Sequence, residues 1–179
     1  LYDLILDKSF GNTDLVIKYI TENEKKARLL FLKAAADLQL ADAAPTLKAI
    51  ITKDKDPQIL AAAVTALGSL RLEDAMPVFT TMAGQTDPEL RQAAISAIAE
   101  TGGKAAVDQL LAFIGDGEET NKLVVEAIAE IHDLYALEKL TGLLASPKTN
   151  VRDTAIDQLM KLGTKATPIL TKAFQNAEA

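Results

Sequence analysis

The chain of 179 residues has no cysteine and no tryptophan, and only 4% of its residues are aromatic. Without cysteine there is no disulfide framework, no thiolate nucleophile and no cysteine zinc site. Since there is also only one histidine, the usual zinc ligand sets cannot be assembled. We therefore expect no metal and no other cofactor. The lack of cysteine fits a reducing compartment without excluding export, and we expect a cytoplasmic protein.

Long apolar runs and excess positive charge are also missing. No run approaches the roughly 20 residues that span a bilayer, so we expect no membrane insertion. The net charge is −6, with a pI near 4.9. This charge opposes binding to phosphate backbones, so we expect no nucleic acid partner. The chain begins at Leu1 rather than methionine, which indicates a fragment, a processed form or an unseen start.

What the chain does have is a repeat of about thirty residues. Small residues recur at Ala43, Ala75, Ala106, Ala136 and Ala166. Four residues later comes a column of large ones: Leu47, Phe79, Leu110, Leu140 and Leu170. A third column lies four further on: Ile51, Ala83, Ile114, Leu144 and Phe174. Because positions i, i+4 and i+8 share one face of a helix, each repeat is predicted to contain a helix buried on this face. We name these the B helices.

A second series of apolar segments precedes the B helices. Its clearest copies begin at Ala63, Ala94, Val124 and Ala155, and residues 27–38 form a diverged first copy. We name these the A helices. The helices expected from both series are 25–38, 43–53, 57–69, 73–84, 88–101, 104–115, 119–132, 134–146, 149–162 and 165–176. Residues 1–23 are expected to form two shorter helices separated by Phe10–Thr13.

Residues that favour helix starts and helix ends agree with this division into A and B helices. Asp56-Pro57 and Asp87-Pro88 precede A helices, where aspartate caps and proline is tolerated. Gly68, Gly102-Gly103 and Gly163 fall where A helices should end. One further column is predicted to lie in the first turn of each B helix, where proline or a carboxylate is favoured. It consists of Pro45, Pro77, Asp108, Glu138 and Pro168.

These segments resemble HEAT repeats, in particular the short type named after phycobilin-lyase subunits. The resemblance rests on Asp87-Pro88-Glu89-Leu90-Arg91, on Val151-Arg152 with the segment after it, and on Ala66-Leu67-Gly68. It covers roughly residues 25–176, although its arginine column reads Leu60, Arg91, Asn121 and Arg152. The resemblance implies that A helices form the convex side and B helices line the concave side.

We therefore expect an all-α protein: a right-handed α-solenoid, or superhelix, of about five stacked antiparallel helical hairpins with an N-terminal helical cap. A single domain would span residues 1–179. Residues 1–24 would form the cap or a degenerate repeat, and residues 25–176 the repeats.

No catalytic constellation emerges from the sequence. His132 is the only histidine and lies where an A helix should end, which indicates a surface residue. The acidic pairs, such as Glu73-Asp74 and Glu118-Glu119, fall at helix starts or turns. Gly115-Asp116-Gly117 lacks the strand and the Gly-Lys-Ser/Thr of a phosphate-binding loop. We expect a protein that is not an enzyme.

One basic cluster comprises Lys25, Lys26, Arg28 and Lys33. A nucleic-acid site is one interpretation, but acidic residues lie alongside and few aromatics are near. A solvated helix face is therefore favoured.

The expected partner surface follows from helix geometry. We take the column from Leu47 to Leu170 as the centre of the buried face of the B helices. Positions about 200° around the helix then face away from the core. The predicted partner-binding residues are Ala49, Thr81, Asp108, Ala112, Glu138, Gly142 and Lys172. Their small side chains equally suit the crowded inside of a curve, so a purely steric role stays open.

These features are compatible with three kinds of function. The favoured one is a non-catalytic scaffold, adaptor or regulatory domain that binds a protein, a peptide or another part of its parent chain through the concave B-helix surface. The alternative is an enzyme-associated subunit resembling phycobilin-lyase HEAT proteins. Nucleic-acid binding is disfavoured by charge.

Overall fold

The computed structural model describes residues 13–21, 24–165, 167 and 171. All regular structure in these residues is helical. The chain divides into two compact units, Leu1–Thr101 and Gly102–Ala179. None of the described helices is long and apolar enough to cross a membrane.

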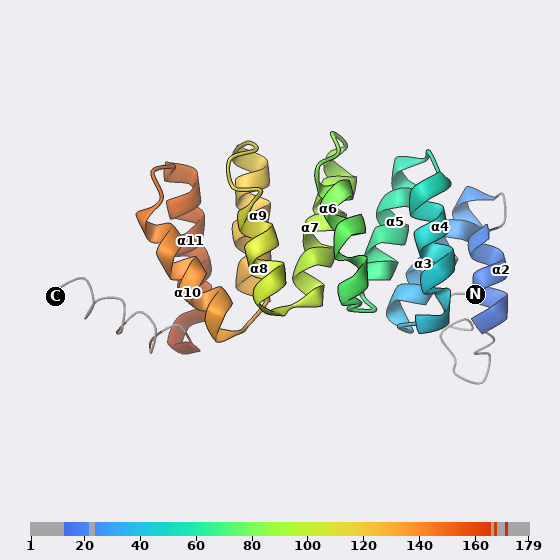
Figure 1. The fold of residues 1–179 in the computed structure, drawn as a ribbon, viewed down its shortest axis with the longest axis horizontal. Helices are drawn as coiled ribbons and strands as arrows, with labels where there is room; N and C mark the ends of the chain where they lie inside the picture. Colours follow the sequence, from blue (N-terminus) through green and yellow to red (C-terminus); the bar gives the residue numbers. More distant parts are fainter. Residues whose placement is uncertain (1–12, 22–23, 166, 168–170, 172–179) are drawn as a thin grey trace. The chain divides into compact units, whose positions relative to one another are not determined.

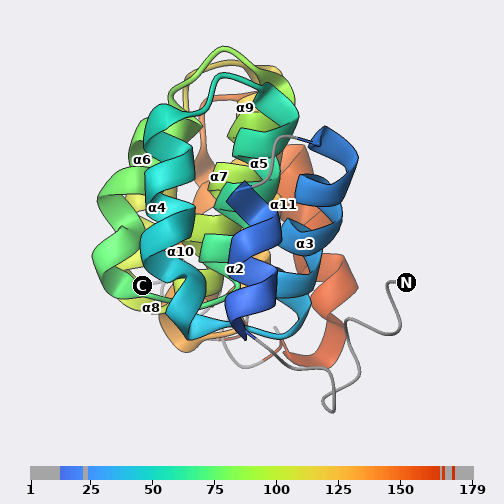
Figure 2. The same ribbon diagram turned by 90° about the vertical axis from the view of Figure 1, so that its right-hand side faces the viewer.

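The first unit is a stack of antiparallel helical hairpins in two layers. Its A helices are α3 (Lys25–Asp37), α5 (Pro57–Gly68) and α7 (Pro88–Thr101). Its B helices are α4 (Ala44–Lys53) and α6 (Met76–Ala83), and α2 (Thr13–Thr21) packs against α3. Figure 1 shows the order of these helices, and Figure 2 shows α4 and α6 on one side with α3 and α5 on the other.

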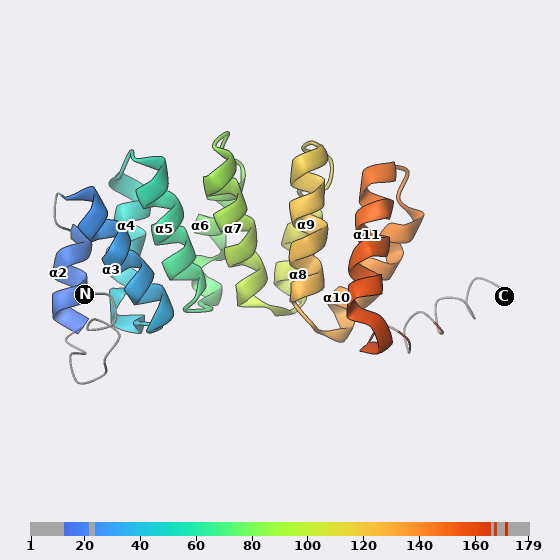
Figure 3. The same cartoon turned by 180° about the vertical axis from the view of Figure 1, so that it is seen from behind.

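The second unit repeats the same arrangement. Its A helices, α9 (Glu118–Glu130) and α11 (Thr149–Leu162), pack side by side, as Figure 3 shows. Its B helices, α8 (Gly103–Leu111) and α10 (Leu134–Gly142), also pack together. The stacked-hairpin, all-α fold is thus confirmed in each unit. Most of the expected final helix, 165–176, and the first part of the expected cap lie outside the described residues.

The predicted buried columns form the core. Leu47, Phe79, Leu110 and Leu140 are fully buried, and so are the alanines four residues before them. In the third column Ile51 and Ala83 are buried, but Ile114 and Leu144 are only half-buried. These two residues lie beyond the ends of α8 and α10, so the helical spacing that placed them on the buried face no longer applies.

The prediction that Asp108 and Glu138 lie in a first helical turn is wrong. In the first unit a 3₁₀ turn precedes Pro45 and Pro77, and the α-helix begins one residue before each proline. Proline has no N–H to donate and its ring clashes with the carbonyl four residues earlier, so an α-helix does not extend a full turn back past it. Aspartate and glutamate have no such restriction. As a result α8 begins five residues before Asp108, and α10 four residues before Glu138.

The turn after each A helix contains at least one residue with a positive φ, in the left-handed region, and after α7 Gly103 is a second one. The first such residue in each turn recurs at repeat spacing, with φ between 49° and 71°: Gln39, Arg71, Gly102, His132 and Gly163. Gly68 is therefore not the left-handed residue of its turn. It is the last residue of α5 and lies against α7, where a Cβ on Gly68 would be 2.7 Å from the Cβ of Ala97.

A column of polar side chains ties four of the A helices, α3, α7, α9 and α11, to the segment before each of them. Arg91 donates to the carbonyl of Gln85 at 2.8 Å, and Arg152 donates to that of Ser146 at 2.7 Å. Arg28 donates from Nε to the carbonyl of Ile20 at 2.9 Å. In the remaining tether the direction is reversed, since the side-chain oxygen of Asn121 accepts from the N–H of Gly115 at 2.7 Å. Arg28 therefore belongs to the arginine column, which the sequence interpretation had begun at Leu60.

Candidate partner-binding surface

In the first unit, the predicted surface residues lie on the exposed side of the B helices. Ala49 of α4 and Thr81 of α6 are both exposed. Thr81 turns its hydroxyl back to the carbonyl of Pro77 at 2.9 Å, so it presents mainly its methyl group to solvent. Beside them, Lys48 of α4 forms an ion pair at 2.7 Å with Asp74 of the turn preceding α6. This surface is thus small and weakly polar, with one exposed ion pair.

In the second unit, Asp108 and Glu138 lie near an aromatic side chain. Asp108, Ala112, Glu138 and Gly142 are all exposed. Ala112 follows the end of α8 and Gly142 is the last residue of α10, so both lie at helix ends rather than within a helical stripe. Lys172 lies outside the described residues.

Tyr135 organises this part of the surface. Its hydroxyl donates to the Asp108 carboxylate at 2.5 Å and so joins α10 to α8. Two ammonium groups flank its ring, Lys104 at 5.3 Å and Lys139 at 5.1 Å from the ring centroid. The hydrogen bond to Asp108 raises the pKa of the Tyr135 hydroxyl, and desolvation adds to the rise. The hydroxyl therefore remains a donor at physiological pH, and the ring is held with its cations in place.

The sequence interpretation missed Tyr135, Lys104 and Lys139. Tyr135 lies three residues before Glu138 and therefore on nearly the same helix face, which was a usable signal. Its partner Asp108 lies 27 residues away in sequence. The starts of α8 and α10 were predicted to within one residue, but no local pattern in the sequence indicates that two side chains so far apart meet.

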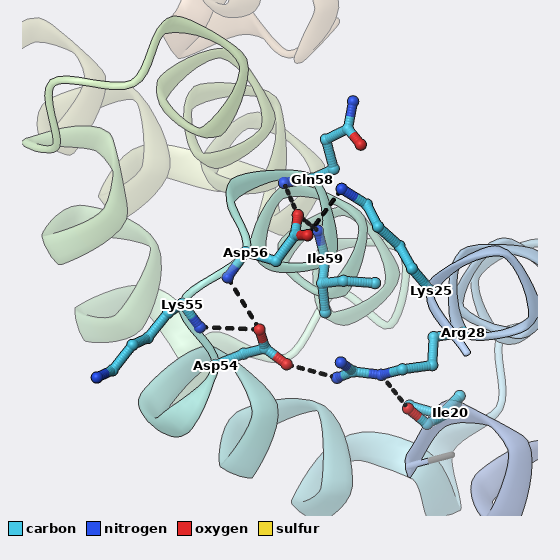
Figure 4. A network of polar contacts seen from close by, with 8 residues as sticks. All are labelled: Ile20, Lys25, Arg28, Asp54, Lys55, Asp56, Gln58 and Ile59. Carbon is cyan, nitrogen blue, oxygen red and sulfur yellow. Dashed lines mark hydrogen bonds and ion pairs between the residues drawn. The ribbon is translucent and has the colours of Figure 1, made fainter. Parts of the chain in front are cut away.

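The basic cluster near the N-terminus is largely paired within the protein. Lys25 forms an ion pair with Asp56 at 2.7 Å, and Lys33 forms one with Asp37 at 2.7 Å. Arg28 contacts Asp54 at 2.6 Å, and the side chains of this pair are only 17% and 18% exposed. Figure 4 shows how Arg28 and Lys25 of α3 reach the loop before α5. The expectation of a fully solvated face is therefore wrong for Arg28, which is half-buried because it tethers a loop.

The two aspartates of this loop have lowered pKa values. Burial raises the pKa of Asp54, but hydrogen bonds from the Asp56 backbone and from Arg28 outweigh it and leave the pKa below its ordinary value. The hydrogen bond from Lys25 is the main cause of the lowered pKa of Asp56, which also caps α5 by accepting from two backbone N–H groups. Both carboxylates therefore stabilise the junction between successive repeats in their charged form.

Two hollows adjoin the B helices. In the first unit, a hollow of about 320 Å³ beside Ala49 is lined by Thr21, Arg28, Thr46, Ile50, Lys53 and Asp54. In the second, a pocket of about 380 Å³ is lined mainly by apolar side chains of α9, α10 and Leu162. His132 and Asp133 are its polar lining residues, and His132 is exposed just after α9, as expected. The residues that the structure describes contain no cluster of three potential metal ligands.

Comparison with known proteins identifies the repeat. A family model described as HEAT repeats matches residues 13–99 and 44–124. One similar structure is the complex of CpcE and CpcF of phycocyanin lyase from Nostoc sp. PCC7120, with a TM-score of 0.61 and 19% identity. That match covers 84% of this chain and 64% of the lyase chain, so this chain spans less than two thirds of it.

A second similar structure is that of an engineered protein, with a TM-score of 0.51 and 18% identity. It covers 94% of this chain and 97% of the engineered one. No curated protein sequence matches the chain. At these identities the structural matches establish the fold alone. Because the family model covers more than half of the sequence, the chain belongs to the HEAT-repeat family.

Proposed function

We propose that the chain is a non-catalytic protein-interaction module that binds a partner protein or peptide on the exposed surface of its B helices. Surfaces of this kind are the usual binding faces of helical-repeat proteins. The observation that carries the proposal is the cluster around Tyr135. An aromatic ring held by a carboxylate and flanked by two cations is the kind of rigid anchor on which binding energy concentrates.

The exposed B-helix surface of the second unit suits an extended or helical peptide. Ala112 and Gly142 at the helix ends leave the backbone accessible, and Glu138 adds a carboxylate. In the first unit the surface at Ala49 and Thr81 carries little charge of its own. A segment with both apolar and polar side chains fits such a surface better than a polyanion does.

The test compares variants that leave the core untouched. Replacing Thr81 and Ala112 with arginine adds bulk and charge to the B-helix surface, and replacing Tyr135 with alanine removes the anchor. Thr65→Arg, an equally exposed site on the A helix α5, is the matched control. Partners captured from the native cell are identified by mass spectrometry, and their affinities are then measured with each purified variant.

The proposal expects at least a tenfold loss of affinity for the B-surface variants and wild-type affinity for Thr65→Arg, with unchanged helical spectra. If the Thr81/Ala112 double variant and Tyr135→Ala both bind the partner at wild-type affinity, the B-helix surface is not the site.

A second candidate is an enzyme-associated subunit, and the structural likeness to the CpcE and CpcF complex favours it. In this case the chain would support a pigment-attaching activity supplied with other subunits. A pigment-attachment assay with and without the chain separates the two candidates, because a pure interaction module leaves the yield of attached pigment unchanged.

A further inference from the structure

The last A helix exposes two apolar side chains on one face. Ile156 is 45% exposed and Met160 is 70% exposed. They are four residues apart on α11 and therefore lie one above the other. Among the described residues, Leu134 is the only other large apolar side chain with comparable exposure. The exposure of this pair requires an explanation, because the corresponding positions in earlier repeats are buried.

The register shows what these positions do in earlier repeats. The residues equivalent to Ile156 are Val64, Ile95 and Val125, and those equivalent to Met160 are Gly68, Ala99 and Ala129. All six are buried. Gly68 lies against Ala97 of the next A helix in the first unit, and α9 packs against α11 in the second. The strip of Ile156 and Met160 thus continues, on α11, the interface by which one A helix meets the next.

Met160 is much larger than the residues at the equivalent positions of earlier repeats. At the equivalent Gly68, even a Cβ would lie 2.7 Å from a neighbouring side chain, and the other equivalents are alanines. A methionine at this position holds a neighbouring helix farther away. Its flexible, polarizable side chain instead adapts to a surface of different shape.

We propose that this strip is the site where a second copy of the chain docks, with α11 packed antiparallel against α11 about a twofold axis. A twofold interface must be self-complementary, and the exposed charges beside the strip meet this demand. Asp153 and Asp157 come earlier in the helix and Lys161 comes later. In the antiparallel arrangement Ile156 faces the second copy's Met160. Along the helix axis, Lys161 then falls between the second copy's Asp153 and Asp157. In a parallel pair the flanks that carry these charges would lie on opposite sides of the interface, so Lys161 would not meet the second copy's aspartates.

The contact is one helix face wide, which is small for a permanent dimer, so the dimer is reversible and depends on concentration. This inference is independent of the proposed function. Its consequence is that two partner-binding surfaces are joined in one particle, which increases avidity for a partner with repeated binding segments.

Sedimentation equilibrium of the intact chain, from low micromolar to near-millimolar concentration, tests the proposal. The wild type should form a reversible dimer, and Met160→Asp should weaken it by at least tenfold while the helical spectrum stays unchanged. Thr81→Asp, on the exposed side of α6, is the control and should dimerise normally. A wild-type chain that stays monomeric throughout, or a dimer that Met160→Asp leaves unchanged, overturns the proposal.

Charge reversal and cross-linking test the antiparallel arrangement. Lys161→Glu should weaken the dimer, and adding Asp153→Lys and Asp157→Lys should restore it. Because the chain has no native cysteine, any disulfide that forms must join engineered thiols. The double variant Ile156→Cys/Met160→Cys should give a covalent dimer on mild oxidation, whereas each single variant and Thr81→Cys should not. Efficient cross-linking by the single variants would contradict the antiparallel arrangement.

Discussion

Gly68 of α5 and Ala97 of α7 approach so closely that a Cβ on Gly68 would lie 2.7 Å from the Cβ and 2.9 Å from the Cα of Ala97. Contacts below 3.0 Å force a shift, and here the obstacle includes backbone. The helical conformation of Gly68 is one that any residue can adopt. Close helix packing, not turn geometry, is therefore the reason for glycine at this position.

We predict that Gly68→Ala destabilises the first unit by about 1–3 kcal/mol, because the two helices must separate to admit the methyl group. Gly142→Ala is the matched control. Gly142 has a helical φ of −60° and nothing within 4 Å of the added Cβ, so stability should be unchanged or rise by up to about 1 kcal/mol. Urea unfolding followed by circular dichroism measures both, and equal effects of the two substitutions would contradict this explanation of Gly68.

Ile98→Asp should unfold at least the first unit. Ile98 is fully buried in the A-helix column, and a buried unpaired carboxylate costs several kcal/mol, which is comparable with the roughly 5–15 kcal/mol that stabilises a typical domain. Ser96→Asp, two residues away and exposed, should have little effect. A melting temperature that Ile98→Asp leaves unchanged would show that the helix register is wrong.

Asn121→Ala should destabilise the second unit by about 1–3 kcal/mol, because it leaves the N–H of Gly115 without its acceptor. Asn121 is only 2% exposed, so water cannot readily replace the lost oxygen. Asn150→Ala is the control, since Asn150 makes only a long contact of 3.5 Å and should change stability by less than about 0.5 kcal/mol. The comparison uses thermal unfolding. A smaller loss for Asn121→Ala than for Asn150→Ala would argue against the tether.

The Arg28–Asp54 pair should make stability depend on acidity. Because the folded state lowers the pKa of Asp54, its contribution is present above the unfolded pKa and is lost as pH falls through the folded one. Asp54→Asn should therefore have a smaller free energy of unfolding than the wild type at pH 7. This difference between the two proteins should disappear as the pH falls below about 4. Asp42→Asn, at an exposed site, should show no such trend. A gap for Asp54→Asn that is constant with pH would contradict the prediction.

The chain should not bind duplex DNA or RNA at physiological salt. Its net charge is −6, and Lys25, Arg28 and Lys33 of the basic cluster already contact carboxylates of the protein. Fluorescence anisotropy with labelled oligonucleotides over a salt series checks this. Binding that weakens steeply with added salt would reopen the nucleic-acid hypothesis.

The sequence predicted best what is repeated and buried. Leu47, Phe79, Leu110 and Leu140 could be placed in the core because burial imposes the same demand at the same position in every repeat. The place of Asp108 and Glu138 within their helices was predicted less well, although the helix starts themselves were close. Proline and aspartate were taken as equivalent at one position, but only proline forbids the helix from extending backwards.

Pairs from different repeats were also missed. Arg28 meets Asp54 across 26 residues, and Tyr135 meets Asp108 across 27. Contacts over such separations produce no local pattern in the sequence, because whether the two side chains meet depends on where the helices end. For the same reason the contact between Tyr135 and Asp108 emerged only from the structure, whereas the exposure of Ala112 and Gly142 followed from helix geometry.

The tethers of Arg28, Arg91, Asn121 and Arg152 each join groups only six to eight residues apart. Each clip joins the first turn of an A helix to the segment that ends the preceding repeat or the cap, so pulling two successive hairpins apart must break one clip. Under mechanical load, a chain of this kind yields one hairpin at a time, and each releases about 100 Å of extended chain. Because each clip breaks separately, the chain extends in steps and a unit does not rupture as a whole.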